Sequence, residues 1–156
     1  LDVLVGQNMT ARQLFENRLI QHLPERLTIN PESRHHLLIE RMENESVVAL
    51  YCPTALQGYS VKAARSQIAD LPKNFLLSGG VDVAVAMAMY PRVLGRDGCR
   101  GHRQPNLVLP SLSLNSGAGY RLSVSSWDGV TRLDKSGSIN EALADDAPGL
   151  LIIEDT

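Results

Sequence analysis

The motif that most clearly suggests chemistry in this chain is Ser78-Gly79-Gly80 followed by Asp82. The apolar run 75–77 before it predicts a strand, and the small apolar residues of 81–90 predict a helix. A glycine turn between a strand and a helix start lets a ligand approach outward-pointing backbone N–H groups. We expect Gly79 or Gly80 to hold a backbone conformation closed to other residues, and the motif indicates an anion-binding site.

Residues 77–83 resemble the phosphate loop of the ATP-pyrophosphatase (PP-loop) family, a strand followed by Ser-Gly-Gly-x-Asp-Ser and a helix. Ser78, Gly79, Gly80 and Asp82 match, and Val83 stands where the family has its final serine. The resemblance implies a nucleotide or another phosphate-containing small molecule at this loop. The alternative is a purely structural β-to-α turn that needs two glycines.

A second group of reactive side chains, Asp97, Cys99 and His102, lies within six residues. These are the types that a thiol nucleophile and its base require. Partners in thiol enzymes come from distant positions, so a regulatory or disulfide-forming thiol and an ordinary loop cysteine stay open as alternatives. Arg96 and Arg100 in the same stretch are candidate counter-charges for a phosphate.

No metal site is expected from the histidines. His35 and His36 lie in a segment that we interpret as a strand, where successive side chains point to opposite faces. Together with His22 and Glu40 they therefore make a poor ligand set. The sequence assigns no catalytic residue and no cofactor.

Composition limits the function classes. With 156 residues, 44% hydrophobic and 21% charged, the chain fits one folded domain. Aromatic residues are only 4%, which predicts an aliphatic core without stacking platforms for single-stranded nucleic acid. A net charge of −2 argues against general nucleic-acid binding. No apolar run is long enough for a membrane span, so a soluble, cytoplasmic location is slightly favoured.

The elements that must position these residues follow from apolar periodicity. Helices are predicted over 11–23, 61–71 and 81–90, with one or two helical turns within 138–144. The runs 36–42 and 46–52, joined by three polar residues, predict a β-hairpin. Further strands are predicted, and they cover residues 1–5, 27–29, 75–77, 106–114, 119–127, 130–133 and 150–153.

Helices concentrate before residue 91 and strands after it. This order predicts an α+β fold, with a mixed or mostly antiparallel sheet and two to three helices packed on one side. The glycine-rich, charged stretch 92–105 is the one place for a domain boundary, and we expect its segment 95–104 to be mobile. The two cysteines, Cys52 and Cys99, leave a disulfide and two free thiols equally open, with Cys52 expected to be buried.

The leading hypothesis is a non-catalytic binding or protein-interaction domain of a larger bacterial protein, because the chain opens without Met and shows no complete catalytic set. Its partner would be another protein or another domain of the same protein. The predicted hairpin 120–133 carries side-chain types enriched at interface hot spots, Tyr120, Arg121, Trp127 and Arg132. The alternative is a nucleotide- or phosphate-binding enzyme that uses 78–82 as its cradle.

Overall fold

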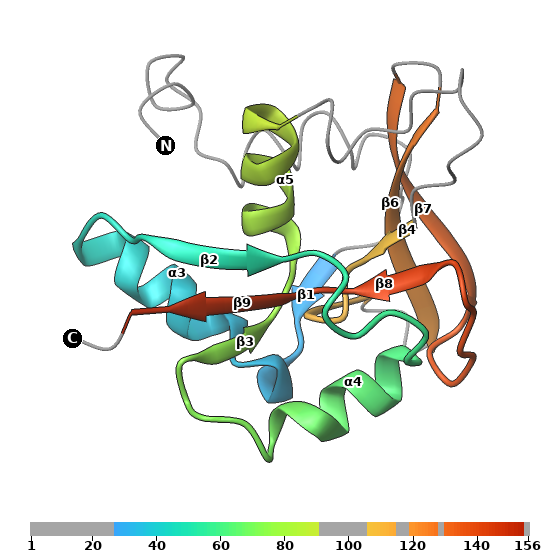
Figure 1. Ribbon diagram of the computed structural model, residues 1–156, viewed down its shortest axis with the longest axis horizontal. Coiled ribbons are helices and arrows are strands. Elements are labelled where there is room, and N and C mark those ends of the chain that lie inside the picture. The colour runs from blue at the N-terminus through green and yellow to red at the C-terminus, as the bar shows by residue number, and fades with distance from the viewer. Residues whose placement is uncertain (1–26, 91–105, 115–118, 128–129, 155–156) are drawn as a thin grey trace.

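The computed structural model describes residues 27–90, 106–114, 119–127 and 130–154 (Figure 1). Within these ranges the chain forms three α-helices, nine strands and one short 3-10 turn, η1. The elements are β1 (Leu27–Ile29), η1 (Pro31–Ser33), α3 (His35–Asn44), β2 (Ala49–Cys52), α4 (Val61–Ile68), β3 (Phe75–Leu77), α5 (Gly80–Met89), β4 (Asn106–Val108), β5 (Leu112–Leu114), β6 (Tyr120–Trp127), β7 (Val130–Ser138), β8 (Asp146–Pro148) and β9 (Leu150–Ile153).

The strands form three sheets. They contain β1-β5, β2-β9-β3 and β7-β6-β4-β8, and every pair is antiparallel except β4 with β8. Gly149 alone separates β8 from β9, so the two strands follow one line across the molecule (Figure 1). This line joins the four-stranded sheet to the three-stranded sheet.

The three-stranded sheet is apolar on both faces. Leu151 and Ile153 of β9 pack with Leu38 of α3, whereas Leu150 packs with Ile68 of α4. Alternation along a strand sends neighbouring side chains to opposite faces, which is why one short strand contacts both helices. The third helix, α5, contributes Val83 to a separate aliphatic cluster with strands of the four-stranded sheet.

The predicted α+β class is confirmed, with mostly antiparallel sheets, few helices and an aliphatic core. Strands at 27–29, 75–77, 120–127 and 150–153, and helices starting near 61 and 80, lie where the apolar patterns indicated. The helices do not all share one side, because α3 and α4 cover opposite faces of the β2-β9-β3 sheet. The predicted elements at 1–5 and 11–23 and the loop 95–104 lie outside the described residues.

The predicted β-hairpin was wrong in its first half. Residues 36–42 belong to helix α3, not to a strand. A short apolar run cannot be assigned by period alone. Here Leu38 and Met42, one helical turn apart, both pack toward the three-stranded sheet, and this contact favours the helix.

Two further boundaries differ from the predictions. The strand expected over 106–114 is two strands, β4 and β5, separated by a turn in which Leu112 N–H donates to Leu109 O. No helix forms over 138–144, where β7 continues to Ser138 and a turn follows. Cys52, expected to be buried, is half-buried.

Candidate functional site

The turn at Ser78 and Gly79 is buried, and the polar groups of Ser78 form hydrogen bonds within the chain. Ser78 N–H donates to Gly149 O at 3.0 Å, and Gly149 N–H donates to the Ser78 hydroxyl at 3.2 Å. Ser111 N–H donates to Ser78 O at 3.1 Å. Ser78 therefore connects the start of α5 to the β8–β9 junction.

A carboxylate of the chain itself occupies the start of α5. Asp82, the third residue of the helix, accepts from Gly79 N–H at 2.8 Å through Oδ1. A negative charge is favoured at a helix N-terminus, and Asp82 supplies it. Arg96 and Arg100, the predicted counter-charges, lie outside the described residues, so the phosphate site of Ser78, Gly79, Gly80 and Asp82 stays a prediction.

Gly79 is required by close packing and not by its backbone angles. Among the described glycines only Gly58 and Gly137 have positive φ, so the expected special conformation at Gly79 or Gly80 was wrong. A methyl group on Gly79 would overlap the Ser111 hydroxyl and lie 3.0 Å from the His35 ring. The glycine lets these two side chains approach the turn.

The buried side chain of His35 lies beside that of Asp82. Its Nδ1 is 3.2 Å from Leu77 O, a pure acceptor, so Nδ1 carries a proton. Its Nε2 faces Asp82 Oδ1 at 3.8 Å, and both side chains are almost inaccessible to solvent. Burial raises the pKa of Asp82, while the nearby His35 and backbone N–H groups oppose that rise.

Ser111, His35 and Asp82 are the residue types of a hydrolase triad, but their geometry differs from one. In a triad the two imidazole nitrogens face the carboxylate and the serine separately. Here Nδ1 is engaged by a backbone carbonyl, and the Asp82 carboxylate lies on the Nε2 side. Ser111 is fully buried. The cluster thus lacks an accessible nucleophile.

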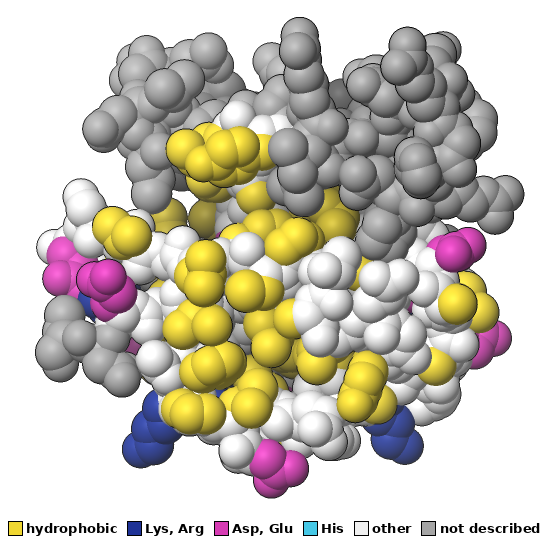
Figure 2. Space-filling model, viewed as in Figure 1, with side chains coloured by type: hydrophobic (Ala, Val, Ile, Leu, Met, Phe, Trp, Pro, Cys, Tyr) yellow, Lys and Arg dark blue, Asp and Glu magenta, His cyan; other side chains and the backbone are white. Residues whose placement is uncertain are grey.

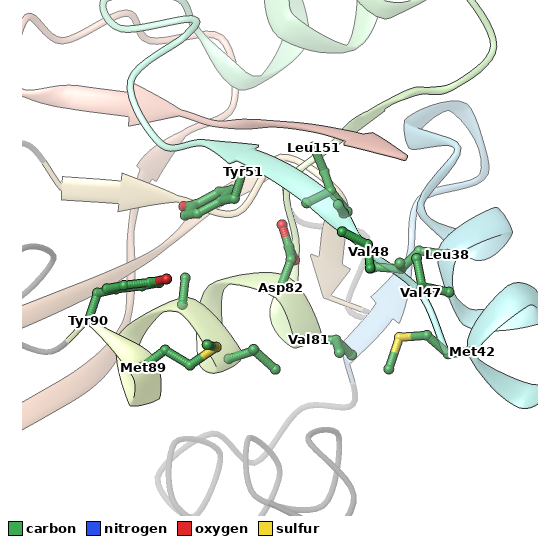
Figure 3. A pocket seen from close by; sticks show the side chains of 13 residues that line it. Leu38, Met42, Val47, Val48, Tyr51, Val81, Asp82, Met89, Tyr90 and Leu151 are labelled. Carbon is green, nitrogen blue, oxygen red and sulfur yellow. The ribbon is translucent and has the colours of Figure 1, made fainter. Parts of the chain in front are cut away.

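A pocket of about 340 Å³ opens beside this cluster (Figure 3). We call it the α3–β2–α5 pocket. One end is aliphatic, and its walls are Leu38, Met42, Val47, Val48, Val81 and Leu151. Tyr51 and Tyr90 lie at the other end, Asp82 lies between the two ends, and the Tyr90 hydroxyl points toward the pocket centre (Figure 3). Burial and the neighbouring Asp82 raise the pKa of Tyr51, so its phenol stays neutral.

The rim of this pocket is apolar and exposed. Val48, Met89 and Tyr90 are 72%, 60% and 56% exposed, values that are high for large apolar side chains. Figure 2 shows that apolar side chains also gather over one face of the described part of the molecule. The aliphatic wall is therefore reachable from solvent across the described surface.

The predicted interaction hairpin is formed by β6 and β7, but Tyr120 and Arg121 differ in their exposure to solvent. Tyr120 is exposed, and Lys135 Nζ lies 4.6 Å from the centre of its ring. Arg121 is buried, with Nη1 2.7 Å from Asp146 Oδ2, so it is not available at the surface. The structure does not describe the side chains of Trp127 and Arg132, and the hot-spot hypothesis stays a prediction.

Comparison of the chain with protein-family models, curated proteins and solved structures finds no match. The described ranges contain no cluster of three His, Cys, Asp or Glu side chains that would hold a metal ion. No helix in those ranges has the length and apolarity to cross a membrane.

Sequence reasoning singled out Asp82 and missed the α3–β2–α5 pocket. Two of its walls, α3 and the segment before β2, come from the stretch that was interpreted as a hairpin. His35 was considered only as a metal ligand, whereas the structure brings it to Asp82. The dense apolar run 37–39 followed by 47–51 was the one signal of this site in the sequence.

Proposed function

We propose that this chain is a non-catalytic binding domain whose binding site is the α3–β2–α5 pocket. The observation that carries the proposal is an open pocket of about 340 Å³ with an aliphatic wall and an exposed apolar rim. Ligand pockets occupy roughly 300–1,000 Å³ and are mainly apolar with a few placed polar groups. Exposed apolar patches commonly mark binding surfaces.

The polar groups of the site support binding better than catalysis. The buried serines Ser78 and Ser111 have no route to solvent among the described residues, and His35 is held by a backbone carbonyl. Asp82 at the start of α5 places a negative charge where a phosphate would have to bind. A phosphate-binding enzyme is therefore the less supported alternative.

The proposal is tested with 1-octanol, an apolar probe, on protein carrying ¹³C-methyl methionine. Met42 and Met89 line opposite ends of the pocket. We expect both of their methyl signals to shift in a saturable way. Assignment uses Met42→Leu and Met89→Leu variants.

Two variants on neighbouring residues of β2 provide the matched control. Ala49→Trp places a large ring in the pocket and should abolish the shifts, because Ala49 lines it. Leu50→Trp, on the opposite face of the strand, should leave them unchanged. Unsaturable shifts, or equal effects of the two variants, would refute the pocket as the binding site. Titration of the same protein with ATP and inorganic phosphate tests the alternative.

A further inference from the structure

Three buried polar atoms around the Gly79 turn have no hydrogen-bond partner among the described residues. They are Asp82 Oδ2, His35 Nε2 and Ser111 Oγ. A buried polar atom without a partner destabilises the folded state, so native proteins rarely leave one unmatched. Of these three residues only Asp82 lines the α3–β2–α5 pocket. Its free oxygen is thus the polar group that a pocket ligand can satisfy.

The hydrogen bonds already formed define what Asp82 offers to a ligand. Oδ1 is used by Gly79 N–H at 2.8 Å, so Oδ2 remains for a new contact. His35 uses its Nδ1 proton on Leu77 O, and its Nε2 is too far from Oδ1, at 3.8 Å, to form a hydrogen bond. Asp82 Oδ2 therefore has no hydrogen-bond partner among the described residues, and His35 does not supply one.

A cationic group on the ligand would supply both a hydrogen-bond donor for Oδ2 and a charge opposite to that of the carboxylate. Hydrogen bonds between an ammonium and a carboxylate are about twice as strong as neutral ones. Tyr51 and Tyr90 line the pocket on the side of Asp82 that faces away from the aliphatic wall, and aromatic rings also attract cations (Figure 3). A carboxylate ligand would instead place a second negative charge beside Asp82.

We propose that the α3–β2–α5 pocket binds a small amine, with the ammonium group against Asp82 and an apolar body along Leu38, Met42 and Val48. This inference rests on the proposed function and assigns the ligand class of the same site. Asp82 is the one charged group among the described residues that line the pocket, and the aliphatic wall lies to one side of it, which supports a ligand with one charged end (Figure 3).

The test compares three eight-carbon probes that differ only in their head group. Octylammonium, 1-octanol and octanoate are titrated calorimetrically into the full chain at pH 7, below their aggregation concentrations. We expect octylammonium to bind at least about tenfold more tightly than 1-octanol, and octanoate to bind most weakly. In Asp82→Asn, octylammonium should lose about tenfold and approach 1-octanol, whose affinity stays unchanged.

The possible failures are distinguishable. If no probe binds, or if Ala49→Trp does not block them, the proposed function fails and the ligand class fails with it. If 1-octanol binds in the pocket but octylammonium binds no more tightly, only the amine inference is overturned. Tighter binding of octanoate than of octylammonium would also overturn only the amine inference. If Asp82→Asn does not fold, the comparison of the three probes in the unsubstituted protein still decides between these outcomes.

Discussion

Gly79 packs so closely against its neighbours that the position has no room for a methyl group. Gly79→Ala would drive a methyl group into the Ser111 hydroxyl and toward the His35 ring. We expect a loss of about 1–3 kcal/mol in the free energy of unfolding, typical of overpacking. Chemical denaturation followed by circular dichroism measures it.

A double-mutant cycle isolates this contact. Ser111→Ala alone should change stability little, because the Ser111 hydroxyl has no partner among the described residues. Combined with Gly79→Ala it should recover part of the loss, since the overlapping atom is gone. Strictly additive effects of the two substitutions would contradict the proposed contact.

Asp82 gives a second prediction at the scale of one residue. Burial raises its pKa above the reference value of 3.8, and the titratable side chains close to it are His35 of α3 and Tyr51 of β2. The native state therefore keeps this proton to higher pH than the unfolded chain, so the carboxyl makes stability fall as pH rises from about 4 through the raised native pKa. Asn cannot lose a proton but can still accept from Gly79 N–H.

We therefore expect Asp82→Asn to gain stability relative to the unsubstituted protein as pH rises from 4 to 7. Melting temperatures across this range provide the measurement. Asp70→Asn, at an exposed position after α4, is the control and should follow the unsubstituted protein. A variant that becomes progressively less stable toward pH 7 would show that the ionised carboxylate stabilises the fold. If the unsubstituted protein is less stable than Asp82→Asn at pH 7, Asp82 lowers the stability of the fold, as expected of a residue retained for ligand binding.

At the scale of elements, we expect the four-stranded sheet to depend on an ion pair that spans β4. Arg121 of β6 and Asp146 of β8 are both buried, and β4 lies between their strands. Arg121→Met should cost about 3–5 kcal/mol, because it leaves Asp146 as an uncompensated buried charge. Combining it with Asp146→Leu should restore much of the loss.

The exposed pair Arg41–Glu45 on α3 is the matched control for this element. Its atoms lie 2.8 Å apart, with Glu45 46% exposed. Glu45→Gln should cost no more than about 0.5 kcal/mol, since solvent screens surface pairs. Equal losses in Arg121→Met and Glu45→Gln, measured by urea denaturation, would remove the special role of the buried pair.

At the scale of the whole molecule, the β8–β9 line ties the two larger sheets together. Gly149 at their junction exchanges hydrogen bonds with Ser78, and a methyl group there would approach the Ser78 hydroxyl at 2.9 Å and the Tyr51 ring at 3.0 Å. The junction is therefore closely packed, and we expect the two sheets to move little relative to each other.

We therefore predict one cooperative unfolding transition. Far-ultraviolet circular dichroism follows α3, α4 and α5, whereas fluorescence follows Trp127, the single tryptophan, which lies in β6. The two denaturation curves should coincide. Separate midpoints would instead place a domain boundary in 92–105, where the sequence allows one.

The amino-acid sequence by itself determined the local elements whose periodicity and end signals agree. The apolar run 75–77, the two glycines and the small residues after them specify a strand, a turn and a helix, and composition specifies an aliphatic core. These features depend on neighbours along the chain, so local physics is sufficient for them.

Only the tertiary structure decided the partners of those elements. The run 36–42 is compatible with strand or helix, and packing against the β2-β9-β3 sheet selected the helix. The approach of His35 to Asp82 and the opening of the α3–β2–α5 pocket both require that helix to be in place. Residues that are distant in the sequence come together only when particular faces of helices and sheets pack against each other. The spacing of residues along the chain does not predict which faces pack.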